Sequence, residues 1–199
     1  MLFTPVQAAN VNTVKAAIVK HSIEMGVDPA ITLSIAKTES GYRHEARSSR
    51  GAVGVFQLMP STARRMGLNP YSLDDNIKGG VMYYKSMYKM FGSVELALAA
   101  YNAGPGNVKK YKAIPPFAET RRFVSKIMTD YRHFKAHPDP TMVAAQSVPP
   151  SIKGTQVVAA SPVHAPLPMV QIEQARNLNV ELVKEIPVEV EVKSQSVAI

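Results

Sequence analysis

The stretch SIAKTESGYRHEARSSRGAVGVFQLMP, residues 34–60, joins the end of an apolar helix to a loop that contains two spaced glycines. The helical part ends in a lone carboxylate, Glu39, which a serine and a glycine follow at once. Gly51 and Gly54 let the backbone approach a neighbouring element closely, because glycine carries no side chain. We expect this loop to fold back beside Glu39 and to shield its carboxyl group from water.

An inert carboxylate in solvent is the simplest interpretation of Glu39, but its surroundings argue against it. A negative charge at the C-terminal end of a helix is opposed by the helix dipole. An apolar helix end and a close loop would partly desolvate the carboxyl group, and desolvation raises the pKa of a carboxylic acid. The pattern therefore favours a glutamate kept protonated near neutral pH, where it can act as a general acid.

Two further segments carry side chains suited to a polar ligand. In GAVGVFQLMP, the amide of Gln57 offers both a donor and an acceptor, while Phe56 and Met59 offer apolar surface for the face of a sugar ring. In the later segment ALAAYNAGPGNVKKY, a helix ends in Tyr101 and Asn102 before a Gly-Pro-Gly break. Ordinary helix termination with Tyr101 in the core explains that segment equally well, so neither segment is specific by itself.

Residues 11–135 read as a series of α-helices whose ends carry recognisable signals. Asp28 and Pro29 combine an N-cap with a proline at the first helical position, and Gly92 is a typical helix stop. The alternation of apolar and polar residues that is typical of strands is scarce here. We therefore expect a mainly α fold, with helices over residues 12–25, 29–39, 72–91, 94–103, 107–111 and 115–134.

The composition changes after residue 140. Residues 141–199 contain six prolines, one glycine and no aromatic residue. A segment with so few large apolar side chains gains little from burial to offset the loss of chain entropy. We expect a flexible tail that serves for docking rather than catalysis, made of a linker over 136–167, a helix over 169–186 and a strand-like segment over 187–197.

The net charge of +8 is concentrated in the first part of the chain. Residues 1–140 hold 19 Lys and Arg against 10 Asp and Glu, whereas residues 141–199 hold 4 against 5. The basic part suits a polyanion, such as nucleic acid, an anionic membrane surface or a cell wall that carries carboxylates, although a solvated cationic face has the same composition. The sequence has no helix-turn-helix, zinc-finger or RNA-recognition pattern, so we expect no nucleic-acid partner.

Other kinds of site lack support in the sequence. The chain has no cysteine, which excludes disulfides and a thiolate nucleophile. His133 and His137 lie four residues apart near a helix end but lack a third ligand, so we expect no metal site. No apolar run approaches the roughly 18 residues that span a bilayer. The N-terminal VQAA only faintly resembles the end of a cleavage site, so we expect no ordinary secretion signal.

Four motifs, taken in order, have a specific resemblance. The series E-S, G-A-x-G-x-x-Q-L-M-P, A-A-Y-N-A-G-P and E-T-R-x-aromatic-V resembles the catalytic domain of the family 1 (Slt-type) lytic transglycosylases. The resemblance covers about residues 17–135, after a lead-in over 1–16 and before the linker and tail over 136–199. It implies a lysozyme-like fold of the goose-type lysozyme and Slt kind. It also implies cleavage of the β-1,4 bond between N-acetylmuramic acid and N-acetylglucosamine in peptidoglycan, with neither a metal nor a cofactor.

The resemblance implies roles for particular residues. Glu39 matches the single catalytic acid and base, and Ser48 matches a serine that hydrogen-bonds near that carboxylate, with Ser49 as the neighbouring alternative. Phe123 stands where the family commonly has a tyrosine, so either the acid is positioned less tightly or another tyrosine replaces the missing hydroxyl. The candidates for that replacement are Tyr101, Tyr111 and Tyr131. The residues that match the lining of the glycan groove are Gln57, Met59, Tyr101 and Asn102.

One carboxyl group suffices for this reaction for a physical reason. Most glycosidases need a second carboxylate, either as a nucleophile or to activate water. In a lytic transglycosylase the muramyl 6-hydroxyl attacks from within the substrate, with the high effective molarity of an intramolecular reaction, and leaves a 1,6-anhydromuramyl end. One alternative is a lysozyme-like hydrolase, whose second carboxylate would be Glu45, Asp74 or Asp75. The other alternative is a non-catalytic module that binds peptidoglycan.

The place of action follows from the substrate. Peptidoglycan lies in the periplasm or cell wall, so a chain without an ordinary leader would reach it by another route. A phage virion that opens the wall locally fits this expectation, as does a secretion or conjugation apparatus. The proteins of that virion or apparatus would bind through residues 141–199.

Overall fold

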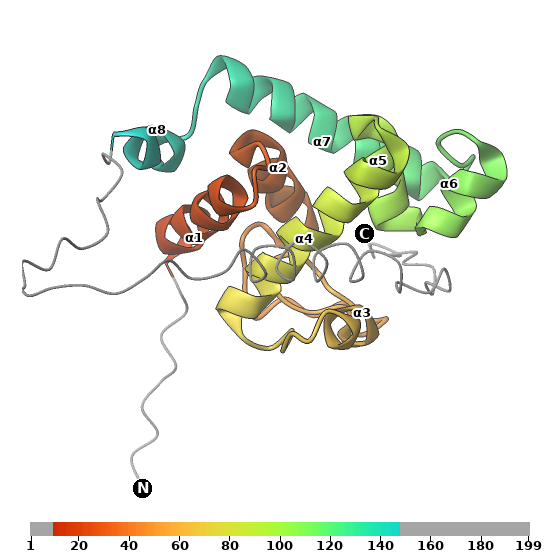
Figure 1. Cartoon of the computed structure of the whole chain (residues 1–199), viewed down its shortest axis with the longest axis horizontal. Helices are drawn as coiled ribbons and strands as arrows, with labels where there is room; N and C mark the ends of the chain where they lie inside the picture. The colour runs from red at the N-terminus through yellow and green to blue at the C-terminus, as the bar shows by residue number, and fades with distance from the viewer. Residues whose placement is uncertain (1–9, 148–199) are drawn as a thin grey trace, which may run out of the picture.

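A computed structural model describes residues 10–147, which form eight helices (Figure 1). Within this range, the β-structure consists of two isolated bridges, so the prediction of a mainly α fold is confirmed. The helix and the strand-like segment expected beyond residue 168, with the flexible docking tail, lie outside the described residues. The helices are α1 (Val11–Glu24), α2 (Pro29–Ser40), α3 (Pro60–Arg65), α4 (Leu73–Phe91), α5 (Val94–Ala103), α6 (Pro105–Tyr111), α7 (Ala118–Ala136) and α8 (Pro140–Gln146).

The predicted end signals act where they were expected. At the start of α2, Oδ1 of Asp28 accepts a hydrogen bond from the backbone N–H of Ala30 over 2.9 Å. The same helix ends at Gly41, whose φ of +62° is the left-handed conformation that glycine adopts without strain. Ser72 caps α4 through the backbone N–H of Asp75, and Gly92 ends it with a φ of +67°.

Two short helices, α3 and α8, were not predicted. Each begins with a proline at its first position and is too short to show a helical repeat of apolar residues. The helix α8 lies where a linker was expected, and its Met142 is buried in the main core. Asp139 fastens it, because Oδ1 caps the helix through Thr141 and Oδ2 accepts a hydrogen bond from Lys15 of α1 over 2.7 Å. The packed helical unit therefore continues past residue 135.

The core lies where α2 packs against α1 and α7, and where α5 packs against α4 and α7. Figure 1 shows α7 running along one side of the molecule from α6 to α8, with α2 beneath it. Side chains from all of these helices are completely buried at the centre: Ile18, Leu33, Ile35, Ile77, Leu98 and Ile127. The C-terminal end of α2 is thus held on a rigid base, and that end carries Glu39.

Within residues 10–147, no helix combines the length and the apolar composition that crossing a membrane requires.

Candidate active site

The loop between α2 and α3 folds back on itself. An antiparallel bridge joins Arg47 to Val53, and a second one joins Val53 to Leu58. The backbone N–H of Ser48 donates to the carbonyl of Ala52 over 2.9 Å, which closes the turn at the tip of the loop. This backbone pairing gives the loop a defined shape although it contains no regular strand or helix.

Ser40, the residue after Glu39, ties this loop to the end of α2. Its Oγ atom donates a hydrogen bond to the carbonyl of Val55 over 2.8 Å and also accepts one from the backbone N–H of Arg43. Only 5% of Ser40 is exposed, so these bonds are shielded from competing water. The loop therefore lies beside the end of the helix that carries Glu39, as the two spaced glycines predicted.

Asn76 of α4, which was not among the residues expected from the sequence, holds the loop from the other side. Its Oδ1 accepts from the backbone N–H of Phe56 over 2.9 Å, while its Nδ2 donates to the carbonyls of Val53 and Pro70 over 2.9 and 3.0 Å. Asn76 is completely buried. One side chain thus satisfies three backbone groups that would otherwise be buried without partners. A buried-looking asparagine in the first turns of a helix was the signal that could have identified it.

Two glycines make room for this arrangement. A Cβ atom at Gly54, which has a φ of +77°, would collide with the side chain of Asn76. A Cβ atom at Gly80 of α4 would collide with the ring of Phe56. The loop and α4 therefore approach more closely than any larger residue at these positions permits.

Glu39 lies half-buried at the end of α2, and its Oε1 atom is shielded from solvent. The charge of Glu39 acts on Tyr101 of α5, which is 2% exposed. Burial raises the pKa of the Tyr101 hydroxyl well above its ordinary value of 10.0, and the negative charge of Glu39 raises this pKa further. The hydroxyl of Tyr101 also donates to the carbonyl of Phe56 over 2.9 Å. The carboxyl group, the loop and α5 thus meet at this tyrosine.

An aromatic layer supports Tyr101. The ring centroid of Tyr83 from α4 lies 5.1 Å from that of Tyr101. The ring of Phe123 from α7 stacks on Tyr101 as well, with a centroid distance of 6.4 Å and an angle of 13° between the ring planes. Phe123, which replaces the family's usual tyrosine, is 9% exposed. The three rings thus join α4, α5 and α7 around Tyr101.

Among the tyrosines considered as replacements for the missing hydroxyl is Tyr101, whose pKa is raised by the charge of Glu39. Tyr111 is 40% exposed and packs edge-on against Phe117. The hydroxyl of Tyr131 donates to Oδ2 of Asp28 over 3.2 Å, at the start of α2 rather than at its end. The geometry therefore favours Tyr101 over Tyr111 and Tyr131 for that role, which remains a prediction.

The other predicted site residues surround the loop. Oγ of Ser48 accepts from the backbone N–H of Ala52 over 2.9 Å, and Ser48 is half-buried. Met59 is also half-buried and occupies the N-cap position of α3. Oδ1 of Asn102 accepts a hydrogen bond from the Thr120 hydroxyl over 2.8 Å, which ties α5 to α7. That these side chains contact glycan stays a prediction.

Gln57 is placed differently from what its predicted role suggested. It is 3% exposed, and its backbone has a φ of +45°. Its Nε2 donates to the carbonyls of Ala46 and Gly54 over 3.2 and 2.9 Å. The amide nitrogen of Gln57 therefore stabilises the loop, and a glycan contact would have to use its carbonyl oxygen.

The carboxylates considered for a hydrolase have other contacts. Oδ1 of Asp74 lies 2.7 Å from Nε2 of His21 in α1, and this hydrogen bond lowers the pKa of Asp74. Oδ2 of Asp75 accepts from the backbone N–H of Asn69 over 2.9 Å. Glu45 is exposed in the loop. Both aspartates thus lie in the first turn of α4 and are engaged in hydrogen bonds there.

The two histidines near the end of α7 stack on each other, with the ring centroids of His133 and His137 5.0 Å apart. In the described part of the chain, no group of three or more His, Cys, Asp or Glu side chains has a geometry suited to a metal ion.

Known proteins resemble this chain in sequence over the region that builds the site. The family model of the transglycosylase SLT domain matches residues 16–124. The transglycosylase of Enterobacteria phage PRD1 is 29% identical over 140 residues, which cover 70% of this chain and 50% of that protein. The soluble lytic murein transglycosylase of Escherichia coli K12 is 30% identical over 147 residues, which cover 60% of this chain and 23% of that protein. The chain thus spans half or less of the length of these relatives.

Solved structures share the arrangement of helices. An inactive mutant of the lytic transglycosylase Slt from Pseudomonas aeruginosa superposes with a TM-score of 0.55 at 30% identity, over 64% of this chain and 25% of that one. The soluble lytic transglycosylase Slt70 from Escherichia coli gives a TM-score of 0.54 at 26% identity, with the same coverage. These structures confirm the expected Slt-type, lysozyme-like fold. Because the family model also covers more than half of the chain, the protein belongs to the transglycosylase SLT domain family.

Proposed function

We propose that this protein is a peptidoglycan lytic transglycosylase, a lyase that cuts the β-1,4 bond between N-acetylmuramic acid and N-acetylglucosamine and leaves 1,6-anhydromuramyl ends. The observation that carries this proposal is the position of Glu39 at the end of α2. Its half-buried carboxyl group lies beside a loop that Ser40 and Asn76 fasten on two sides, and close to Tyr101. Membership of the SLT domain family supports it independently.

In the proposed reaction, Glu39 begins as the neutral acid. It donates its proton to the glycosidic oxygen as the bond from that oxygen to the anomeric carbon of the muramyl residue breaks. The 6-hydroxyl of the same muramyl residue then attacks that carbon and forms the 1,6-anhydro bond, and its proton passes to the Glu39 carboxylate. The acid is thereby regenerated without water, metal or cofactor.

The surroundings of the carboxyl group suit both steps. The Oε1 atom of Glu39 is shielded from solvent, and removal from water generally favours the neutral, proton-donating form of a carboxyl group. The raised pKa of Tyr101 keeps its hydroxyl neutral at physiological pH. Tyr101 therefore acts as a positioning residue that joins the loop to α5, rather than as an acid or base.

A hydrolase is the less favoured alternative because it needs a second carboxylate near the bond. Asp74 and Asp75 are engaged at the start of α4, by His21 and by the backbone of Asn69. Among the relatives, the inactive Slt from Pseudomonas aeruginosa carries a glutamate-to-glutamine exchange, which fits a reaction that needs a glutamate carboxyl group.

The products of digestion test the proposal. Purified peptidoglycan treated with the protein should release fragments with anhydromuramyl ends, identified by mass spectrometry. Reducing muramyl ends, heavier by one water, would identify a hydrolase instead. The absence of any product would leave a module that binds peptidoglycan without cleaving it.

Exchange of Phe123 for tyrosine tests whether the missing hydroxyl matters. Phe123→Tyr should leave kcat/KM on peptidoglycan unchanged or raise it, because the added hydroxyl lies on a ring already stacked against Tyr101. Phe117→Tyr, a half-buried phenylalanine that packs against Tyr111, is the matched control and should have no effect. A clear fall in kcat/KM for Phe123→Tyr at an unchanged melting temperature would contradict the prediction.

We further propose that the protein acts in the periplasm or cell wall on behalf of a phage virion or a secretion or conjugation apparatus. The similarity to a phage transglycosylase supports the first of these settings. Partner proteins would bind through the proline-rich tail. Because α8 belongs to the packed helices, a deletion that tests this role should begin at residue 148. Undiminished incorporation of the shortened protein into particles or apparatus would refute it.

A further inference from the structure

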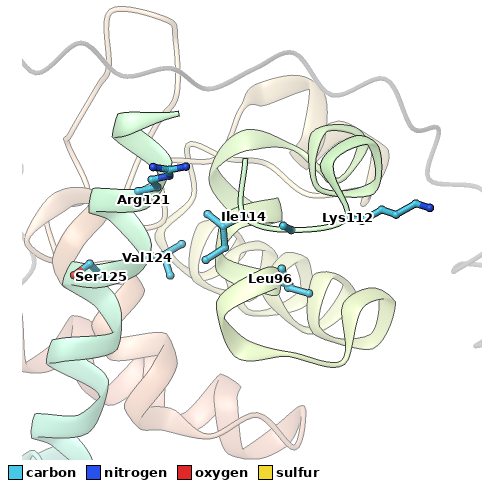
Figure 2. Close-up of a pocket in the computed structure, with 7 residues that line it drawn as sticks. Leu96, Lys112, Ile114, Arg121, Val124 and Ser125 are labelled. Carbon is cyan, nitrogen blue, oxygen red and sulfur yellow. The ribbon is translucent and has the colours of Figure 1, made fainter. Parts of the chain in front are cut away.

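An open trough lies on the surface between α5, the segment that follows α6, and α7 (Figure 2). The space above it is open to solvent and measures about 700 Å³, enough for a short peptide to lie along it. Figure 2 shows Val124 of α7, Ile114 of the connecting segment and Leu96 of α5 placed around its floor. Val124 is 5% exposed, and the other two are half-buried. The floor therefore suits small aliphatic groups.

Two basic side chains flank this apolar floor. Arg121 lies above Val124 at one end, and Lys112, which follows the last residue of α6, extends into solvent at the other (Figure 2). Residues 105–126 contain six Lys and Arg but a single acid, Glu119. No acidic side chain is among the residues that line the trough, all of which belong to the described part of the chain. Glu95, next to Leu96 in α5, accepts a hydrogen bond from Ser93 at the start of that helix. An anionic occupant is thus favoured.

The trough adjoins the candidate active site through α7. Thr120 and Phe123 of this helix contact Asn102 and Tyr101, and the residues that directly follow them, Arg121 and Val124, line the trough. Successive residues of an α-helix are about 100° and 1.5 Å apart. The two sites therefore lie on adjoining faces of the same turns of α7.

We propose that this trough binds the acidic stem peptide that branches from the muramic acid of the substrate. Alanine methyl groups of the peptide would lie on the floor of Leu96, Ile114 and Val124, and its carboxylates would pair with Arg121 and Lys112. An extended peptide spans about 3.3–3.6 Å per residue, so a stem of four residues is about as long as a helix is wide, roughly 10–12 Å. This inference rests on the proposed function, because the substrate has to be peptidoglycan.

The test measures binding of the free tetrapeptide stem, without glycan, to the wild-type protein. Arg121→Gln should weaken binding about five- to tenfold, because it removes a charge-assisted hydrogen bond. Ile114→Asn should also weaken binding of the peptide, because it puts a polar side chain on the apolar floor. Lys126→Gln is the matched control, since it removes the same charge from an exposed position on α7 that does not line the trough. It should change the dissociation constant less than about twofold. Melting temperatures show that each variant is folded.

Three results would overturn the proposal: no saturable binding, equal weakening by Lys126→Gln and Arg121→Gln, or equal binding of a stem whose carboxylates are amidated. A separate measurement uses glycan strands from which the peptides have been removed beforehand, and asks whether the wild-type protein digests them. If those strands and intact peptidoglycan both stay uncut, the proposed function fails, while the peptide titration still decides whether the trough binds the stem.

Discussion

We expect Glu39→Gln to abolish the cleavage of peptidoglycan, with kcat lowered by about 10³-fold or more. General acid and general base catalysis each contribute about 10²- to 10⁴-fold to a rate. Glutamine has the shape of glutamic acid but has no acidic proton to give to the glycosidic oxygen. It also cannot accept the proton of the 6-hydroxyl. Both steps of the proposed reaction are therefore lost together.

The measurement is the release of soluble fragments from purified peptidoglycan, followed by mass spectrometry. Glu45→Gln is the matched control, because it makes the same chemical change at an exposed position of the neighbouring loop. That control should keep its full rate. The Glu39→Gln protein should still unfold at nearly the wild-type temperature and still sediment with insoluble peptidoglycan. If it cleaved at more than a small fraction of the wild-type rate, Glu39 would not be the catalytic acid.

The second large effect is expected for Asn76→Ala, which should lower the free energy of unfolding by about 3–5 kcal/mol. The change removes hydrogen bonds to Phe56, Val53 and Pro70 in a fully buried place, and it leaves those backbone groups without partners. For a domain of this size, the melting temperature should fall by about 10 °C or more. Cleavage should fall as well, since the loop that Asn76 holds lies beside the end of α2.

Asn107→Ala separates this effect from the loss of any asparagine in a helix. Its Nδ2 donates a hydrogen bond of 2.8 Å to the carbonyl of Ala103, in a partly buried place. We expect a loss of about 1 kcal/mol for that control, the ordinary value of one hydrogen bond. Thermal unfolding of both variants decides the matter. Similar melting temperatures for the two would mean that Asn76 does not hold the loop.

Sequence patterns predicted the longer helices well, because their signals are local. Asp28 with Pro29, and Gly92, act within a few residues of the ends that they set. The helices α3 and α8 escaped prediction because six or seven residues are too few to show a helical repeat. They are stabilised by packing instead, as the burial of Met142 in the main core shows for α8.

By itself, the sequence determined the mainly α class, the order of the four motifs and the family that they indicate. The match to that family in turn made Glu39 the candidate catalytic residue. Only the tertiary structure revealed that Asn76 holds the loop, that the amide of Gln57 faces the loop backbone, and that the charge of Glu39 acts on Tyr101. It also brought Leu96, Ile114 and Val124 together in a trough. The physical reason is distance along the chain: caps and helical repeats act over a few residues, whereas these contacts join residues that only the packing of helices brings together.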